Sequence, residues 1–159
     1  MEKLLLTEPG RKRLTEELDL LKTTERPAII KAIAEARAHG DLKENAEYHS
    51  AKEKQGFIER RIKELEGVLA HGEVFAADAD SAGGKVLFGC RVTIKDDDGN
   101  KRNFRLVSKY ETDTAAGMIA ITSPLGKALV GKSVGDIAEV KAPAGTVEYE
   151  IVAVDYPAS

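Results

Sequence analysis

The sequence predicts an α+β protein in which an antiparallel α-helical coiled-coil hairpin precedes a small antiparallel β-sheet domain with one short helix. From about residue 7 to residue 73, apolar residues recur three and four positions apart, which is the spacing of one helix face. In the second half, short apolar runs bounded by turn-forming residues are typical of strands. We therefore expect a hairpin over residues 1–75, a linker over 76–85 and a sheet domain over 86–159.

The first expected helix begins near Thr7, because Thr7 followed by Pro9 is typical of a helix start. Pro27 lies inside the helical pattern. We expect a bend or a local break there, since proline lacks a backbone N–H. One apolar side indicates that this helix packs against one neighbour. That side consists of Leu14, Leu18, Leu21, Ile30 and Ile33.

A second stripe with similar spacing predicts a second helix, and it consists of Ile58, Ile62, Leu65 and Leu69. Between the stripes, Gly40 can adopt the left-handed conformation that ends a helix, and Asp41 can cap the next helix. Two helices of about 30 residues joined by a tight turn must pack antiparallel. We therefore expect residues 39–48 at the far end of a helical hairpin.

The second half is interpreted as a small antiparallel sheet with one helix. The expected strands are residues 86–94, 104–107, 118–121, 137–140 and 147–154. Turn-forming residues at 96–100 and 143–145 predict two β-hairpins. Ser123 is expected to cap a short helix over Pro124–Val130 that ends at Gly131.

The composition excludes several classes of protein. The net charge of −3 over 159 residues is not that of a protein that binds duplex nucleic acid through its whole surface. With no Trp and 5% aromatic residues, the core must be largely aliphatic. The single cysteine, Cys90, excludes an intrachain disulfide and a cysteine-rich metal site, and we expect it to be buried. No stretch resembles a signal peptide or a membrane span, so we expect a cytoplasmic protein without membrane contact.

Three acidic residues mark the predicted end of the hairpin. Asp41, Glu44 and Glu47 are spaced three apart, which places their side chains on one side of the turn. Carboxylates at this spacing are a partial ligand set for Mg²⁺, whose remaining ligands would come from a partner. The alternative is structural, because acidic residues in a first helical turn are favoured by the helix dipole. Spacing alone does not decide between the two.

Basic residues and histidines lie close to the same turn. Arg37, Lys43 and Lys52 could steer a phosphate chain toward the carboxylates, or could form a solvated helix face. His39 and His49 could form a metal pair with the acids, but their positions on either side of the turn favour surface residues.

The stretch AEARAHGDLKENAEYH, from Ala34 to His49, closely resembles the tip of the bacterial transcript-cleavage elongation factors, the Gre family. The resemblance is closer to the GreA type, because the more basic stretch expected of the GreB type is missing. It covers nearly the whole chain in order. Further matching segments are residues 51–57, 86–89, 123–132 and 147–150.

The resemblance implies an FKBP-like C-terminal domain that docks at the rim of the secondary channel of RNA polymerase, while the coiled coil reaches the active centre. Asp41 and Glu44 match the acidic tip residues that help to position Mg²⁺ and a hydrolytic water shared with the polymerase. The factor then stimulates the polymerase to cut nascent RNA in backtracked, arrested complexes, and elongation resumes. It is not itself an enzyme, and the isolated protein holds no Mg²⁺.

The resemblance also implies roles for other residues. Arg37 and Lys52 match a basic patch that touches extruded RNA, although a lysine cannot make the bidentate phosphate contact of an arginine. The docking segment includes Ser123, Pro124, Lys127 and Lys132. Some family members are inhibitors with an altered tip, but Asp41-Leu42-Lys43-Glu44-Asn45 is intact here.

Two rival functions remain. An FKBP-like fold suggests a prolyl isomerase, whose pocket is lined by aromatic side chains, but fold alone does not establish function. The aromatic residues available are Phe88, Phe104, Tyr110, Tyr149 and Tyr156. The second rival is a coiled-coil adaptor or chaperone, which would work without the carboxylates of Asp41 and Glu44.

Overall fold

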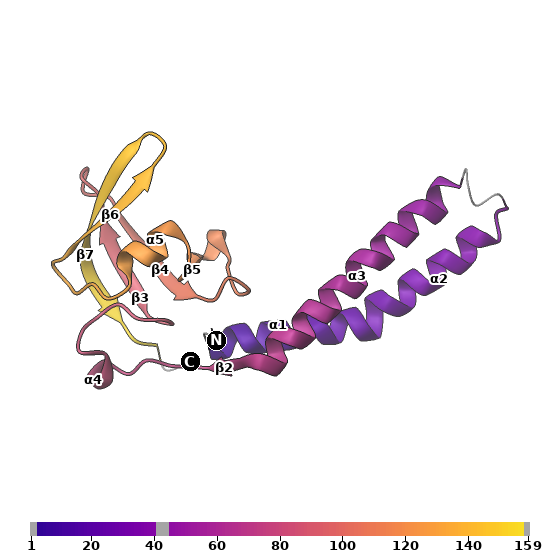
Figure 1. Ribbon diagram of the computed structural model, residues 1–159, viewed down its shortest axis with the longest axis horizontal. Coiled ribbons are helices and arrows are strands. Elements are labelled where there is room, and N and C mark those ends of the chain that lie inside the picture. Colours follow the sequence, from indigo (N-terminus) through magenta and orange to yellow (C-terminus); the bar gives the residue numbers. More distant parts are fainter. Residues whose placement is uncertain (1–2, 41–44, 158–159) are drawn as a thin grey trace. The chain divides into compact units, whose positions relative to one another are not determined.

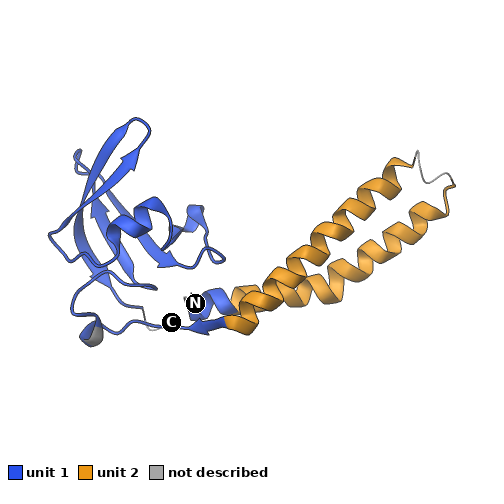
Figure 2. Cartoon of the chain, in the orientation of Figure 1, with its two compact units in different colours: residues 1–11, 72–159 blue, residues 12–71 orange. Residues whose placement is uncertain are grey.

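The computed structural model describes residues 3–40 and 45–157. The chain forms two compact units, residues 12–71 and residues 1–11 together with 72–159 (Figure 2). The first contains a long helical hairpin and the second a curled five-stranded sheet with a short helix (Figure 1). The predicted fold class, a helical hairpin followed by a small sheet domain, is confirmed.

The first helical arm consists of α1 (Glu8–Leu20), the π-helical turn η1 (Leu21–Glu25) and α2 (Arg26–Arg37). Thr7 caps it as expected, because its Oγ1 accepts a hydrogen bond from the Gly10 N–H at 3.1 Å. The helix does not break at Pro27. The wider turn before it bonds the Arg26 N–H to the carbonyl of Leu21, five residues back.

The second arm is α3 (Ala46–His71), which packs against α2 through Ile29, Ile33, Ile58 and Ile62. Ile30 was predicted to face α3 but is 52% exposed, and Ile29 takes its place. The extra residue in the π-helical turn changes which side of α2 faces its partner. At the other end of α3, Val68 is buried rather than Leu69.

Ion pairs flank the apolar seam of the hairpin. The Arg26 guanidinium contacts the Glu59 carboxylate through two hydrogen bonds of 2.8 Å, and these bonds raise the pKa of Arg26 and lower that of Glu59. Arg61 Nη2 lies 2.7 Å from Glu17 Oε2. Such bidentate pairs add geometric specificity to the packing of the two arms.

The sheet has the order β5-β4-β3-β7-β6. Its strands are β3 (Arg91–Lys95), β4 (Lys101–Val107), β5 (Met118–Ala120), β6 (Ile137–Ala142) and β7 (Gly145–Asp155). Three pairings are antiparallel as expected, but β5 is parallel to β4. The sheet is therefore mixed. Residues 108–117 lead the chain back from the end of β4 to the level of Arg105, where β5 begins with Met118 and runs in the same direction as β4.

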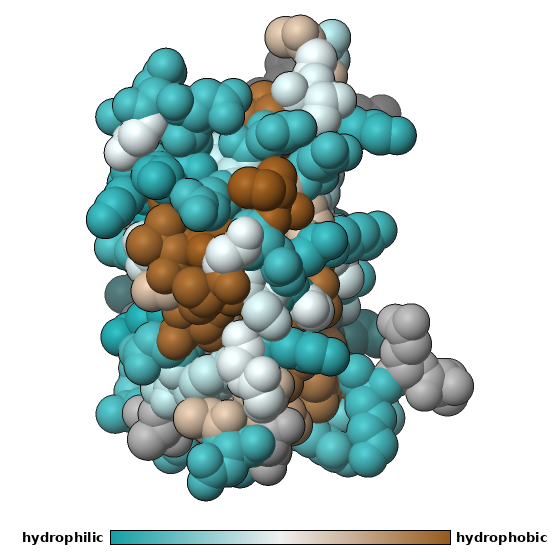
Figure 3. All heavy atoms as spheres, turned by 90° about the vertical axis from the view of Figure 1, so that its left-hand side faces the viewer, coloured by the Kyte–Doolittle hydropathy of each residue, from teal (hydrophilic) through white to brown (hydrophobic). Residues whose placement is uncertain are grey.

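The core of the sheet unit is largely aliphatic, as the composition predicted. It contains Val86, Cys90, Val92, Ile94, Phe104, Leu106, Leu129, Ala138 and Ile151. Residues 86–90 were predicted to be part of a strand, but β3 begins only at Arg91. Apolar side chains also gather on the face shown in Figure 3. Exposed apolar residues of this unit include Val130, Val134, Ile137 and Val147.

Further short elements that were not predicted include β1 (Leu4–Leu6), β2 (Gly72–Val74), α4 (Ala79–Ala82) and the 3-10 helix η2 (Thr114–Ala116). Strands β1 and β2 pair in parallel.

Glu111 attaches the segment after β1 to the sheet. Its carboxylate is 1% exposed and accepts hydrogen bonds from the N–H (2.8 Å) and hydroxyl (2.5 Å) of Thr7. It also accepts bonds from the N–H (3.0 Å) and hydroxyl (2.6 Å) of Ser108. Gly10 leaves room for it, since a Cβ there would lie 1.6 Å from Glu111 Oε1.

Candidate functional site

Asn45 organises the end of the hairpin where the two arms are joined. Its Oδ1 accepts a hydrogen bond from the Tyr48 N–H at 3.0 Å, and its Nδ2 donates to the Ala36 carbonyl at 2.7 Å. Asn45 therefore caps α3 and ties its start to the end of α2. The helix that was expected to follow directly on Asp41 begins only at Ala46, and Asp41 itself lies outside the described residues.

The two carboxylates predicted to carry the chemistry, Asp41 and Glu44, lie outside the described residues, as does Lys43. They belong to the short segment that connects α2 to α3. Glu47, the third acidic residue of the motif, is exposed, and its Oε2 lies 3.4 Å from Nδ1 of His39. Within residues 3–40 and 45–157, no group of three His, Cys, Asp or Glu side chains could hold a metal ion.

The basic residues near the turn have separate neighbours. The Arg37 guanidinium carbon lies 5.9 Å from the centre of the Tyr48 ring, and the Tyr48 ring meets His49 edge-on at 5.6 Å. Lys52 Nζ lies 3.3 Å from the side-chain oxygen of Gln55. Arg37 and Lys52 are both exposed, so their charges are accessible to a polyanion.

In the sheet unit, Ser123 caps α5 (Pro124–Leu129) as predicted. Its Oγ accepts from the Gly126 N–H at 3.1 Å and its hydroxyl donates to the Ala120 carbonyl at 2.6 Å. Gly126 packs directly against the backbone before the helix. A Cβ at this position would lie 2.3 Å from the Ala120 carbonyl oxygen, so a larger residue would not fit without a shift. Lys127 is exposed, and Lys132 is half-buried.

Two hollows adjoin the segment that leads into α5. One, of about 490 Å³, is lined by Thr112, Thr114, Met118, Ile119, Ala120, Ser123, Pro124, Leu125 and Val140. The other, of about 390 Å³, includes Ile121 and Thr122 in its wall. Segment 118–125 therefore borders apolar cavities, whereas the sequence had indicated only a strand over 118–121 and the helix cap at Ser123.

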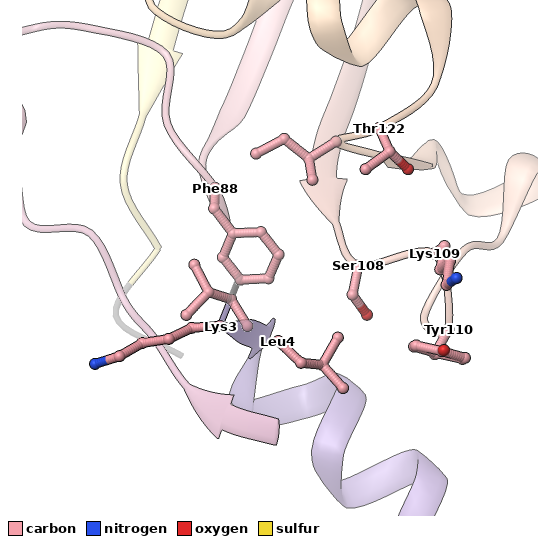
Figure 4. A pocket seen from close by; sticks show the side chains of 9 residues that line it. Lys3, Leu4, Phe88, Ser108, Lys109, Tyr110 and Thr122 are labelled. Carbon is pink, nitrogen blue, oxygen red and sulfur yellow. The ribbon is translucent and has the colours of Figure 1, made fainter. Parts of the chain in front are cut away.

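The 390 Å³ hollow combines apolar surface with the positive charge of Lys109. Leu4, Leu5, Phe88 and Ile121 provide the apolar surface, and Lys109 adds positive charge, whereas the ammonium of Lys3 lies 3.7 Å from Glu73 Oε2. Figure 4 shows Phe88 and Leu4 on one side of it and Ser108, Lys109 and Tyr110 on the other. Sequence reasoning missed this hollow because part of its wall is β1, a strand that was not predicted.

The aromatic residues considered for an isomerase pocket are dispersed. Phe104 is buried in the core, and Tyr149 and Tyr156 pack against that core. Only Phe88 and Tyr110 line the 390 Å³ hollow. Cys90 is fully buried, as predicted, and burial raises the pKa of its thiol.

The fold and the site define a protein of two parts, a helical hairpin with a charged, exposed end and a sheet unit with apolar surface hollows. Comparison with protein families gives a match in each part. Residues 4–74 match the N-terminal family of transcription elongation factors, and residues 80–156 match the C-terminal family of GreA/GreB elongation factors. The chain belongs to the GreA/GreB family of transcription elongation factors.

Two relatives, each more than 50% identical to this chain, agree with this assignment. The transcription elongation factor GreA of Xanthomonas campestris pv. campestris is 53% identical over 95% of this chain and 96% of that protein. GreA of Alkalilimnicola ehrlichii is 51% identical over 98% of this chain and 99% of that protein. Among solved structures, the GreA factor homolog Gfh1 of Thermus thermophilus is 27% identical over 96% of this chain and 99% of that chain, with a TM-score of 0.44. In the described part of the chain, every helix is too short or too polar to span a membrane.

Proposed function

We propose that this chain binds bacterial RNA polymerase, inserts its hairpin into the secondary channel, and stimulates Mg²⁺-dependent cleavage of nascent RNA in backtracked, arrested complexes. Elongation can then resume from the new 3′ end. The observation that carries the proposal is the connection of α2 to α3 by the segment containing Asp41 and Glu44, in a chain that matches elongation factors along most of its length.

The donor set suits Mg²⁺ but is incomplete. Carboxylate oxygens are hard ligands, and Mg²⁺ commonly takes one or two of them together with waters and phosphate oxygens. Asp41 and Glu44 would hold the ion only together with ligands from the polymerase. When bound, Mg²⁺ would lower the pKa of a water and offset charge on the phosphate. The task of this chain is to deliver the two carboxylates.

Delivery requires a hairpin that keeps its end in place. The isoleucine seam and the Arg26–Glu59 and Arg61–Glu17 pairs hold the two arms together. Asn45 joins the ends of the arms directly beside the carboxylate segment. Arg37 and Lys52 are then available to contact the extruded RNA.

We place the main docking surface on the sheet unit, around Ser123, Pro124, Lys127 and Lys132. The two apolar hollows beside segment 118–125 support this choice, because an apolar side chain of a partner can be buried there. The cation of Lys109 at one hollow favours an acidic group on the partner surface.

The test is a cleavage assay with the purified chain, a backtracked complex of the cognate polymerase carrying labelled RNA, and Mg²⁺. We expect the chain to accelerate RNA cleavage in the complex and to leave the same RNA intact without polymerase. Cleavage of free RNA by the nuclease-free chain would show that the polymerase is not needed. No acceleration within the complex would refute the proposed function.

A further inference from the structure

Phe57 is an aromatic side chain of the hairpin that does not pack in its core. It lies in α3 and is 68% exposed, whereas the next residue, Ile58, is 5% exposed. An exposed phenylalanine gains little from apolar burial and has a lower helix propensity than alanine or the long polar residues. Its ring therefore contributes little to the stability of the hairpin.

The Phe57 ring has a cation beside it. The Arg60 guanidinium carbon lies 5.8 Å from the ring centre, which is within cation–π range. Gly56 gives the guanidinium room, since a Cβ there would lie 3.3 Å from Arg60 Nη1. Across the described ranges, 3–40 and 45–157, Arg60 forms no ion pair with a carboxylate.

The ring borders a surface hollow of about 420 Å³, lined by Phe57, Arg60, Arg61 and Glu64. Arg61 is held by Glu17 at 2.7 Å and by Glu64, so its charge is already paired. The hollow thus has an aromatic wall, a fixed guanidinium from Arg61 and an available positive charge from Arg60.

We propose that Phe57 and Arg60 form a stacking site for an unpaired base of single-stranded RNA, with Arg60 facing the adjoining phosphate. Single-strand binding surfaces combine an exposed ring, on which any base can stack, with a cation that attracts the backbone. Phe57 comes eleven residues after Ala46, the first residue of α3, which is about 17 Å along the helix. Only RNA extruded well past the hairpin end would reach it.

This inference rests on the proposed function, which brings the extruded 3′ segment of the nascent RNA alongside the hairpin. The other candidate occupant of the hollow is an apolar side chain of the polymerase. A base requires an aromatic ring at position 57, whereas an apolar side chain requires only apolar surface.

The experiment uses the full-length chain bound to a backtracked polymerase complex whose extruded RNA carries 4-thiouridine. Irradiation crosslinks the base to its neighbour, and the crosslinked peptide is mapped. Phe57→Tyr keeps the ring, while Phe57→Leu keeps an apolar side chain without a ring. Ile30→Ala is the matched control, because it removes another exposed apolar side chain of the hairpin, from α2. Arg60→Gln tests the cation.

We expect a crosslink at or beside Phe57 in the wild type, in Phe57→Tyr and in Ile30→Ala. The crosslink yield should fall about tenfold in Phe57→Leu, as expected for the loss of one stacking contact, and should also fall in Arg60→Gln. Competition for polymerase should give equal affinities for all variants.

Wild-type crosslinking by Phe57→Leu, or a crosslink that maps elsewhere, would overturn the stacking site. A loss of polymerase affinity in Phe57→Ala that Phe57→Leu restores would assign the ring to a protein contact and would also overturn it. If the bound wild type crosslinks at Phe57 but does not stimulate cleavage, the proposed function fails while the stacking site stands.

Discussion

Asn45 changes what is expected of the acidic residues beside it. Asn45 caps α3, which begins at Ala46, so the cap of this helix is supplied without the side chains of Asp41 and Glu44. Asp41 and Glu44 can therefore be changed without removing the cap. Their effect on RNA cleavage can then be separated from an effect on stability.

We predict that Asp41→Asn and Glu44→Gln will each keep the wild-type melting temperature and polymerase affinity while cleavage falls by orders of magnitude. Each change keeps size and polarity but removes the charge that would hold Mg²⁺. Single-turnover cleavage of a backtracked complex measures the effect. More Mg²⁺ should partly restore the variant with the weaker defect. If both variants cleave at wild-type rates while bound, the two carboxylates take no part in RNA cleavage.

Glu111 is a residue that the sequence could not identify, since a carboxylate in a polar loop gives no sign that it is buried. We predict that Glu111→Gln will destabilise the protein by about 1–3 kcal/mol, because an amide cannot accept all the hydrogen bonds from Thr7 and Ser108. Urea unfolding measures this cost.

A double-mutant cycle isolates the contact between Glu111 and Gly10. Gly10→Ala should destabilise the wild type through the clash with the Glu111 carboxylate, and it should cost less in a Glu111→Ala background. Equal costs in the two backgrounds would show that the close approach of these two residues has no energetic consequence.

At the scale of the elements, the sequence predicted what local signals determine. Turn residues fixed the positions of the β3–β4 and β6–β7 hairpins, and Ser123 fixed the start of α5. The sequence did not predict the β1–β2 pair, because strands of three residues whose partner is distant in the chain leave no local pattern. The π-helical turn was not predicted either, because a helix predicted from the spacing of apolar residues is taken to have the same number of residues in every turn.

Ile29 and Ile30 test the effect of the π-helical turn. We predict that Ile29→Ala will cost about 2–5 kcal/mol in unfolding free energy, because Ile29 is buried against α3. The neighbouring Ile30→Ala should stay within about 0.5 kcal/mol of the wild type, because Ile30 is exposed. Denaturant unfolding of the full chain compares them. If Ile30→Ala destabilised the protein more than Ile29→Ala, the π-helical turn would not change which side of α2 faces α3.

On the scale of the whole molecule, the sheet unit depends on both ends of the chain. A fragment of residues 80–159 lacks Thr7, which donates two hydrogen bonds to Glu111. It also lacks Leu4 and Leu5, which form part of the wall of the 390 Å³ hollow.

We predict that residues 1–11, joined by a flexible linker to residues 72–159, will compete with the full-length chain for polymerase. Residues 12–71 alone should compete poorly, because the proposed docking surface lies in the other unit. Fragment 80–159 should bind more weakly than the two linked segments. Competition by residues 12–71 as strong as that of the full chain would place the main docking affinity on the hairpin.

The parallel pairing of β1 with β2 also has a consequence for the order of folding. Leu4 pairs with Gly72, so the entire helical hairpin is the connection between two parallel strands. Contacts inside the hairpin are made early in synthesis, and its closure brings the two strand segments together at a smaller loop-closure entropy than an unstructured connection would require. Thr7, which precedes the hairpin, must nevertheless wait for Glu111, which follows it by about 40 residues, before its two hydrogen bonds to that carboxylate form. A change that slows hairpin formation should therefore also delay completion of the sheet unit, although no residue of the sheet itself is altered.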